Sequence, residues 1–352
     1  MKKRVIVLYG GRSAEHEVSV ESAASVMEAI DQTLFEPIPV GITRQGQWVF
    51  CTDPRDLRQQ GIKEVLPAPE QNGIGKIAYI LSQGDVVFPV LHGTYGEDGA
   101  VQGLLEMVGI PYVGAGVGGS ALGMDKVMMK AVFSHYGLPV TPYVWSTVRD
   151  FEASPETLIA DAEGNLNYPM FVKPASLGSS VGVTKVHSRQ ELLAAVKEAA
   201  RFDRKVMVEQ GVQAREIEVS VMGNDDVVTS VPGEIVPGAD FYDYSAKYLS
   251  GSTMLIPADI SAELTEQFRV MAVRVYRAID CHGLARVDFF LLQDNSLLVN
   301  EINTMPGFTV NSMYPKMWDA SGLDYTSLIT SLITLAFDAF ASKRRISLSL
   351  SE

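Results

Sequence analysis

The feature that most constrains this chain is a predicted β-hairpin toward its C-terminal end. Two apolar runs, Val287–Leu292 and Ser296–Ile302, flank a short turn of Gln, Asp, Asn and Ser residues. Apolar runs separated by turn-forming residues are typical of antiparallel strands joined by a tight connection. We expect the functional chemistry of the chain to be organised around this hairpin.

The polar ends of this hairpin predict a cluster of oxygen ligands. Side chains alternate between the two faces of a strand, so Arg286 and Asp288 share a face, as do Glu301 and Asn303. The hairpin can bring these ends together into one patch of two carboxylates, a carboxamide and a guanidinium. Oxygen ligands of this kind suit Mg²⁺, which completes its octahedron with phosphate oxygens and water. A hairpin with solvated polar ends is the alternative that the hairpin alone leaves open.

Composition limits the classes of partner. The chain has 352 residues, enough for two or three domains, and its 47% hydrophobic content predicts a substantial core. A net charge of −13 argues against nucleic acid as the main partner, and any polyanionic ligand needs locally placed cations. Cys51 and Cys281 provide neither a disulfide framework nor a zinc spacing, which fits a reducing cytoplasm.

Neither end of the chain predicts a membrane segment. The apolar run after Met1 is too short for a signal peptide and ends in glycines, so we expect a first buried strand. Leu328–Ala341 is apolar, but it contains Asp338 and is too short to span a bilayer. We predict a core helix there.

Residues 1–123 alternate strand and helix signals. This rhythm predicts an open α/β sheet that binds ligands at the carboxyl ends of its strands. Polar clusters at 10–15 and 91–98 follow two of these strands, whereas Pro54–Lys76 reads as a surface excursion without an assigned function. The predicted elements are Val5–Leu8, Val18–Ile30, Phe35–Gly41, Val86–Val90 and a helix near Val101–Gly109.

Two motifs in this region do not carry the chemistry that they suggest. His16 is followed by Val20 rather than by a second histidine, which excludes the zinc-protease pattern. Gly114–Gly119 satisfies G-x-G-x-x-G but follows a late strand and lacks an acidic residue about 20 positions on, so dinucleotide binding is disfavoured. We interpret it as a connector.

A glycine- and serine-rich loop follows a short strand in the middle of the chain. The helix Val127–Tyr136 and the strand Tyr168–Lys173 precede Ala175–Val183, whose N–H groups and hydroxyls can surround phosphate oxygens. The loop lacks the terminal Gly-Lys-Ser/Thr of a Walker A motif. A plain glycine-rich turn is the alternative, and the adjacent lysine at the strand end favours phosphate.

The next segments predict further strands, two helices and a second loop. Strands at Val206–Glu209 and Arg215–Ser220 follow a helix at Arg189–Ala200. Residues 232–256 combine tyrosines, a lysine, glycines and prolines, which suits a loop that closes over a site, although an exposed connector fits this segment alone. The helix Ala262–Ile279 then leads into the hairpin.

The motifs R-V-D at 286–288 and N-E-I-N-T-M-P-G-F-T at 300–309 resemble the metal-binding end of the D-alanine–D-alanine ligase family, within the ATP-grasp superfamily. The likeness covers nearly the whole chain. It implies a mixed α/β and α+β architecture, the ATP-grasp fold. An N-terminal open parallel-sheet domain (1–123) precedes two α+β subdomains that clasp ATP, a central one (124–215) and a C-terminal one (216–352).

The resemblance implies an enzyme that joins two D-alanines through an acyl phosphate and releases ADP, for peptidoglycan precursor synthesis. A D-alanine–D-lactate ligase or another ATP-grasp carboxylate–amine ligase is the first alternative. A catalytically silent nucleotide-binding module is the more distant one, and the intact set of carboxylates and lysines argues against it. A tyrosine at position 248 is similar to the dipeptide-forming members, which implies D-alanine as the second substrate.

The resemblance also assigns roles to individual residues. The catalytic set comprises Glu15, Ser179, Tyr248, Arg286 and Gly307. The substrate-binding set comprises Glu15, His92, Arg286, Gly307, Ser312 and Met313, where Met313 replaces the leucine of many relatives. The ATP-binding set comprises Lys126, Lys173, Ser179, Ser180, Glu209, Glu216 and Lys247. The metal-binding set comprises Asp288, Glu301 and Asn303.

The same resemblance implies the cofactors and the setting of the protein. It implies ATP and two magnesium ions that share Glu301, with manganese as a possible substitute. It also implies a cytoplasmic homodimer that acts on small molecules and binds neither nucleic acid nor membrane.

Overall fold

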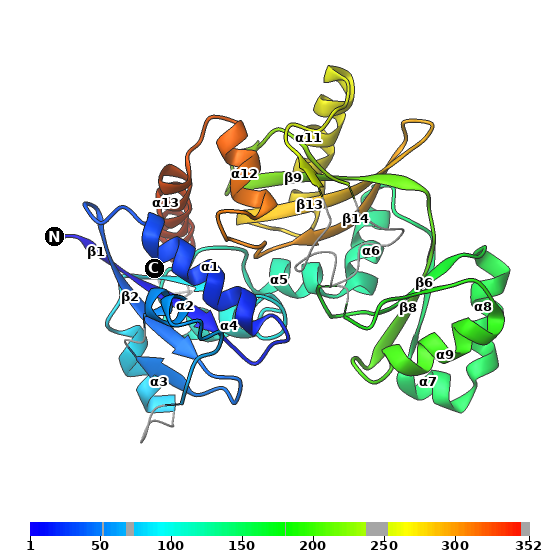
Figure 1. Ribbon diagram of the computed structural model, residues 1–352, viewed down its shortest axis with the longest axis horizontal. Helices are drawn as coiled ribbons and strands as arrows, with labels where there is room; N and C mark the ends of the chain where they lie inside the picture. The colour runs from blue at the N-terminus through cyan, green and yellow to red at the C-terminus, as the bar shows by residue number, and fades with distance from the viewer. Residues whose placement is uncertain (51–52, 68–73, 180, 237–252, 346–352) are drawn as a thin grey trace, which may run out of the picture.

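The computed structural model describes residues 1–50, 53–67, 74–179, 181–236 and 253–345. Within these residues the chain forms a mixed α/β structure with three sheets, arranged as three neighbouring parts (Figure 1). The first sheet uses strands from the start of the chain, the second uses the middle, and the third contains the predicted hairpin.

The first sheet confirms the predicted open α/β architecture. Its strand order is β3-β2-β1-β4, with β1 parallel to both β2 and β4. Parallel neighbours end at the same sheet edge, so the polar clusters after β1 and β4 come together there. The strands are β1 (Lys3–Gly10), β2 (Phe35–Ile42), β3 (Trp48–Phe50) and β4 (Val86–Val90). The helices are α1 (His16–Ala29), α2 (Pro54–Gln59), α3 (Ile74–Leu81), α4 (Ala100–Val108) and α5 (Val117–Met124).

The second sheet has the order β5-β8-β6-β7, and all of its neighbouring strands are antiparallel. Apolar side chains on one face pack against the helices that follow β5 and β7, which gives this part a core of its own. The strands are β5 (Tyr143–Thr147), β6 (Met170–Pro174), β7 (Thr184–Val186) and β8 (Lys205–Gln210). The helices of this part are α7 (Val148–Ala153), α8 (Pro155–Asn165) and α9 (Arg189–Ala199), whereas α6 (Lys126–His135) packs its buried face in the core of the third sheet.

The third sheet has the order β12-β11-β9-β13-β14, with β10 paired to β9. The predicted domain division at 215/216 falls inside β9, and both predicted boundaries stay predictions. The strands are β9 (Ala214–Gly223), β10 (Val227–Thr229), β11 (Gly233–Val236), β12 (Thr253–Leu255), β13 (Gly283–Leu292) and β14 (Leu297–Asn303). The helices are α11 (Ala262–Ala278), α12 (Met313–Ala320) and α13 (Tyr325–Arg344).

The hairpin of β13 and β14 brings its polar ends together, as predicted. Arg286 lies opposite Asn303, and Asp288 lies opposite Glu301, before a bulge that follows Asp288. Strand alternation places the apolar neighbours of these residues on the other face, where Phe289 packs edge-to-face against Phe268 of α11. The polar face therefore stays available for a site, while the apolar face is anchored by the core.

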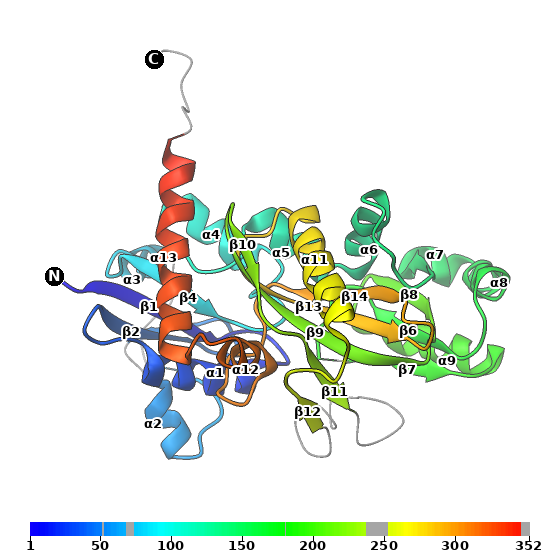
Figure 2. The ribbon, with the colours of Figure 1, turned by 90° about the horizontal axis from the view of Figure 1, so that it is seen from above.

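The C-terminal helix is longer than predicted and covers the first sheet. Leu328, Leu332 and Ile333 of α13 are buried in one cluster with Val5 and Val7 of β1. Both ribbon views show α13 beside this sheet (Figure 1, Figure 2). By length and composition alone this helix could cross a membrane, but its buried face packs on residues from the start of the chain. The core-helix prediction is confirmed.

The sequence predicted a surface excursion at 54–76, but its described part is anchored in the core. Its start forms α2, and Leu57 and Val65 are buried in the same cluster as β1. The backbone N–H of Val65 donates to Nε2 of His16 at 3.0 Å, while Nδ1 of His16 lies 2.7 Å from the Gly11 carbonyl oxygen. Both contacts are satisfied by one neutral tautomer, with the proton on Nδ1.

The glycine-rich stretch at 114–119 serves as a packing connector. A Cβ at Gly116 would lie 2.8 Å from the His282 ring, and a Cβ at Gly283 would lie 2.9 Å from the Gly114 backbone. The turn before β13 therefore approaches this stretch too closely for side chains. This contact fixes the first part of the chain against the third sheet and supports the connector interpretation.

We predict that His16→Asn lowers stability and weakens its pH dependence. Burial lowers the pKa of His16, so the folded state favours the neutral ring. The neutral ring therefore stabilises the fold above pH ~6.5, the pKa of histidine in the unfolded chain, and this stabilisation is lost as the pH falls below that value. Asparagine leaves the Val65 N–H without its acceptor, which should cost about 1–3 kcal/mol at pH 7.5. Urea unfolding from pH 7.5 to 5 measures both effects. Parallel stability curves for the two proteins would contradict this role.

Candidate active site

Two cavities meet at the polar face of the hairpin, and together they are lined by every predicted site residue that the structure describes. The first has a volume of about 530 Å³ and lies between the first sheet and the hairpin. The second has a volume of about 640 Å³ and lies between the second and third sheets. Both are lined by Lys126, Gly178, Ser179, Glu218, Arg286 and Glu301.

The polar clusters of the first sheet supply one wall of the first cavity. Ser179 of the glycine- and serine-rich loop donates a hydrogen bond to Glu15, which links two segments that are distant in sequence. His92 is buried, with Nδ1 3.0 Å from the Met305 carbonyl oxygen and Nε2 2.9 Å from the Ser22 hydroxyl. These contacts tie the loop after β4 to the segment after β14.

The segment after β14 forms the opposite wall. Gly307 lies close to Ser312, because a Cβ at Gly307 would sit 3.0 Å from the Ser312 hydroxyl oxygen. Ser312 accepts a hydrogen bond from the Thr309 N–H at 3.1 Å and precedes the first turn of α12. A backbone approach of this kind and a helix N-terminus are both suited to an anionic group.

Arg286 is held between two carboxylates at the junction of the cavities. Its Nε and Nη2 atoms each donate to Asp288 at 2.6 Å, and Nε also lies 2.9 Å from Glu218. Asn303 donates to the same Asp288 carboxylate at 2.9 Å. Burial alone would lower the pKa of Arg286, but Asp288 and Glu218 outweigh burial and raise it. The guanidinium therefore stays charged at the cavity wall.

Lys126, at the start of α6, contacts both the hairpin and the glycine- and serine-rich loop. Its ammonium lies 3.4 Å from Glu301 and donates to the Leu177 carbonyl at 2.8 Å. The residue opens α6, because the Asp125 carboxylate caps the N–H groups of the next two residues. Asp125 itself pairs with the buried Lys205. This arrangement fixes a cation above the predicted metal-binding carboxylates.

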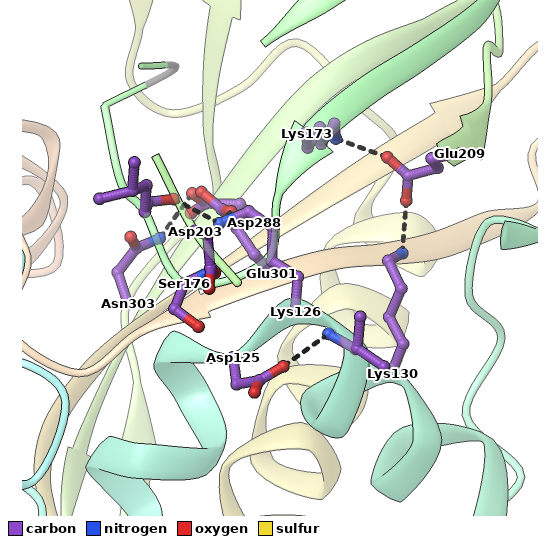
Figure 3. Close-up of polar contacts among 12 residues, drawn as sticks. Asp125, Lys126, Lys130, Lys173, Ser176, Asp203, Glu209, Asp288, Glu301 and Asn303 are labelled. Atoms are coloured by element: carbon purple, nitrogen blue, oxygen red, sulfur yellow. Dashed lines mark hydrogen bonds and ion pairs between the residues drawn. The ribbon is translucent and has the colours of Figure 1, made fainter. Parts of the chain in front are cut away.

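Glu209 sits between two lysines in the second cavity (Figure 3). One of its oxygens pairs with Lys173 of β6, and the other lies 2.6 Å from Lys130 of α6. Burial alone would raise the pKa of Glu209, but the two lysines lower it to about 2. The carboxylate is thus ionised although it is only 2% exposed.

Sequence reasoning missed two residues that the structure brings into this site. Lys130 follows Lys126 by one helical turn, and a helix places such residues on one face. Glu218 follows Glu216 by two positions on β9, so both point to the cavity face of the strand. Periodicity within the predicted elements was the signal that could have identified both. The predicted residues Ser180, Lys247 and Tyr248 lie outside the described residues.

The arrangement suits a ligand with several negative charges. Cations from α6, β6 and β13 surround the second cavity and its junction with the first, in a chain that is acidic overall. Within the described residues, no group of three or more His, Cys, Asp or Glu side chains could hold a metal ion. The donors that are present, Asp288, Glu301 and Asn303, fit a magnesium ion that takes its remaining ligands from phosphate and water.

Comparison with protein families gives matches over most of the chain. The model described as "D-ala D-ala ligase N-terminus" matches residues 4–115, and "D-ala D-ala ligase C-terminus" matches residues 132–334. A D-alanine–D-alanine ligase of Natranaerobius thermophilus is 48% identical, and the match covers 100% of both chains.

Solved structures share the same architecture. The D-alanine–D-alanine ligase of Coxiella burnetii superimposes with a TM-score of 0.81 at 36% identity, covering 98% of this chain and 96% of that one. The VanG D-Ala:D-Ser ligase of Enterococcus faecalis gives a TM-score of 0.83 at 36% identity, covering 96% of this chain and 100% of that one. The predicted ATP-grasp architecture is therefore confirmed.

We predict that Gly93→Ala destabilises the protein and displaces Glu15. Gly93 has φ +74°, and a Cβ there would lie 2.6 Å from the Ser13 hydroxyl and 2.7 Å from the Glu15 carboxylate. The backbone strain should cost about 1–3 kcal/mol. Gly103→Ala in α4 is the matched control, since its Cβ meets nothing within 4 Å and should add about 0.5–1 kcal/mol. Chemical denaturation compares the two, and equal effects would refute the prediction.

Proposed function

The chain belongs to the D-alanine–D-alanine ligase family, and we propose that its site joins two D-alanine molecules to D-alanyl-D-alanine at the expense of ATP. The observation that carries this proposal is the shared wall of the two cavities. A ligase of this kind must bring a carboxylate in one compartment to the γ-phosphoryl group of a nucleotide in another. Lys126, Arg286 and Glu301 lie where the two compartments meet.

In the first step, one anion attacks another. A carboxylate oxygen of the first D-alanine bonds to the γ-phosphorus, the bond from that phosphorus to ADP breaks, and an acyl phosphate forms. The protein's contribution is positioning and charge neutralisation. Lys126 and Lys173 are placed to hold the phosphates, and Glu15 is placed to pair with the ammonium of the substrate. At about 4 Å a charge pair in a partly shielded site is worth about 4 kcal/mol.

In the second step, the amine of the second D-alanine attacks the acyl carbon and phosphate leaves. Negative charge moves to the carbonyl oxygen in the tetrahedral intermediate. Arg286 and the backbone N–H of Gly307 line the same cavity and can stabilise this oxygen, where one donor is typically worth about 3–4 kcal/mol. Ser312 and the first turn of α12 are placed to bind the carboxylate of the second substrate.

Asp288, Glu301 and Asn303 are the residues that would hold magnesium, or manganese in its place. Bound there with the nucleotide, the metal supplies further neutralisation of phosphate charge. These residues present their oxygens on one face of the hairpin, beside the lysines of the second cavity. Mg²⁺ commonly uses one or two carboxylates plus substrate phosphates. The proposed number of ions is two, with Glu301 shared.

The comparisons favour D-alanine as the second substrate over the alternatives. Curated relatives that match over the full chain at 45–48% identity are D-alanine–D-alanine ligases. The D-Ala:D-Ser ligase of Enterococcus faecalis is only 36% identical. A D-alanine–D-lactate ligase remains the alternative from the sequence. A silent nucleotide-binding module is disfavoured, because the described cations and carboxylates converge on one junction.

We also propose a cellular setting and an oligomeric state for the protein. We place it in the cytoplasm, where its nucleotide is available, and Cys281 is a buried free thiol. A homodimer is supported by exposed apolar side chains at the end of α4 and the start of α5, including Met107 and Val117. Peptidoglycan precursor synthesis is the process that uses this dipeptide in the family.

We predict phosphate release from Mg-ATP that depends on D-alanine. The assay supplies D-alanine, L-alanine, D-serine and D-lactate singly and with D-alanine, and mass spectrometry identifies the product. D-Alanyl-D-alanine should be the main product, since the chain groups with dipeptide-forming relatives. A mixed product with D-lactate or D-serine as the main species would select the alternative substrate. No release with any of these would favour the silent module.

We predict that Asp288→Asn removes most of the stabilisation that magnesium adds to the ADP complex. Binding to the folded state alone raises stability by about 2.7 kcal/mol at 100 times Kd. Thermal melting with ADP, with and without Mg²⁺, measures the gain. Asp294→Asn, at the exposed turn of the same hairpin, is the control and should keep it. Equal magnesium effects in the two variants would remove Asp288 from the metal site.

A further inference from the structure

Lys130 approaches the second cavity from behind one of its lining residues. It is 1% exposed and lies 2.6 Å from the Glu209 carboxylate, and it is not among the residues that line either cavity. Lys173 reaches the same carboxylate from the cavity side and lines the cavity with it. Figure 3 shows Glu209 between these two lysines, one on each oxygen. The two lysines therefore have different access to a bound ligand.

This difference matters once a nucleotide is present. In the proposed function, on which this inference rests, Lys173 holds phosphate oxygens and Glu209 faces the adenine. When Lys173 turns to phosphate, the Glu209 oxygen that it contacted becomes available to accept a hydrogen bond. The other oxygen stays paired with Lys130, which has no path to the phosphates through the cavity.

Glu209 must remain a carboxylate for this contact. A carboxylate only accepts hydrogen bonds, which matches the exocyclic NH₂ of adenine, whereas a protonated carboxyl group also donates. A buried carboxylate that loses its counter-ions takes up a proton. Burial lowers the pKa of Lys130, and the facing carboxylate of Glu209 acts in the opposite direction. Lys130 and Glu209 are paired at 2.6 Å, so the charge of each offsets the cost of burying the other.

We propose that Lys130 is a positioning residue that keeps Glu209 ionised and oriented, and thereby sets the preference for a 6-aminopurine over a 6-oxopurine nucleotide. Without Lys130, Glu209 becomes neutral when Lys173 leaves. A neutral carboxyl group can donate to the O6 atom of hypoxanthine. Loss of Lys130 therefore changes which base the cavity accepts, in addition to any loss of packing.

The test compares kcat/KM for ATP and for ITP, both with D-alanine, in four proteins. Lys130→Met removes the charge and should reduce the ATP-to-ITP ratio by at least about tenfold. Lys130→Arg keeps the cation and should keep most of the ratio. Lys205→Met is the matched control. Like Lys130, Lys205 is buried, forms an ion pair and lines neither cavity, but its partner is Asp125 and not Glu209. It should lose thermal stability with little change in the ratio.

The outcomes distinguish a positioning role of Lys130 from a purely structural one. An unchanged ratio in Lys130→Met, with active wild-type protein, overturns the proposal and leaves Lys130 a structural residue. An equal fall in Lys205→Met overturns it as well, because the effect would then be general. If Lys130→Met gives no folded protein, Lys130→Gln decides by the same ratio, since it keeps an N–H donor and removes the charge. Wild-type protein without D-alanine-dependent phosphate release would instead refute the proposed function.

Discussion

The mutual neutralisation of buried charges at the hairpin is the interaction on which the rest of the structure depends. Arg286 is held by Asp288 and Glu218, and Glu209 is held by Lys130 and Lys173. The first group joins β13 to its neighbour β9 within the third sheet, and the second joins β6 and β8 of the second sheet to α6. Removing one member of such a pair leaves an uncompensated charge, which is costly in a buried site.

Ligand binding in this molecule is therefore an exchange of partners. The groups that would hold phosphate and metal already contact one another within the described residues, so the ligand replaces protein ion pairs with its own. The net binding free energy is therefore the difference between the contacts made with the ligand and the ion pairs that the ligand replaces. Residues behind the cavity, such as Lys130, keep their partner through this exchange. They preserve the charge and position of the groups that touch the ligand.

The first cavity depends on a second constraint, the meeting of the two ends of the chain. The first sheet is covered on one face by α1 and by α13, and His92 contacts the Met305 carbonyl. The wall that carries Glu15 and the wall that carries Gly307 are thereby held opposite each other. The apolar contacts of α13 thus contribute to the shape of a cavity that none of its residues lines.

The sequence by itself determined the local elements and the face of each polar residue. Strand alternation predicted that Arg286, Asp288, Glu301 and Asn303 share a patch, and the register confirms it. Tertiary structure alone decided which charges pair, that α13 closes the first sheet, and that Val65 is buried against it. Periodicity specifies the direction of a side chain within its own element. Partners across elements depend on how the sheets pack, which a single sequence does not encode locally.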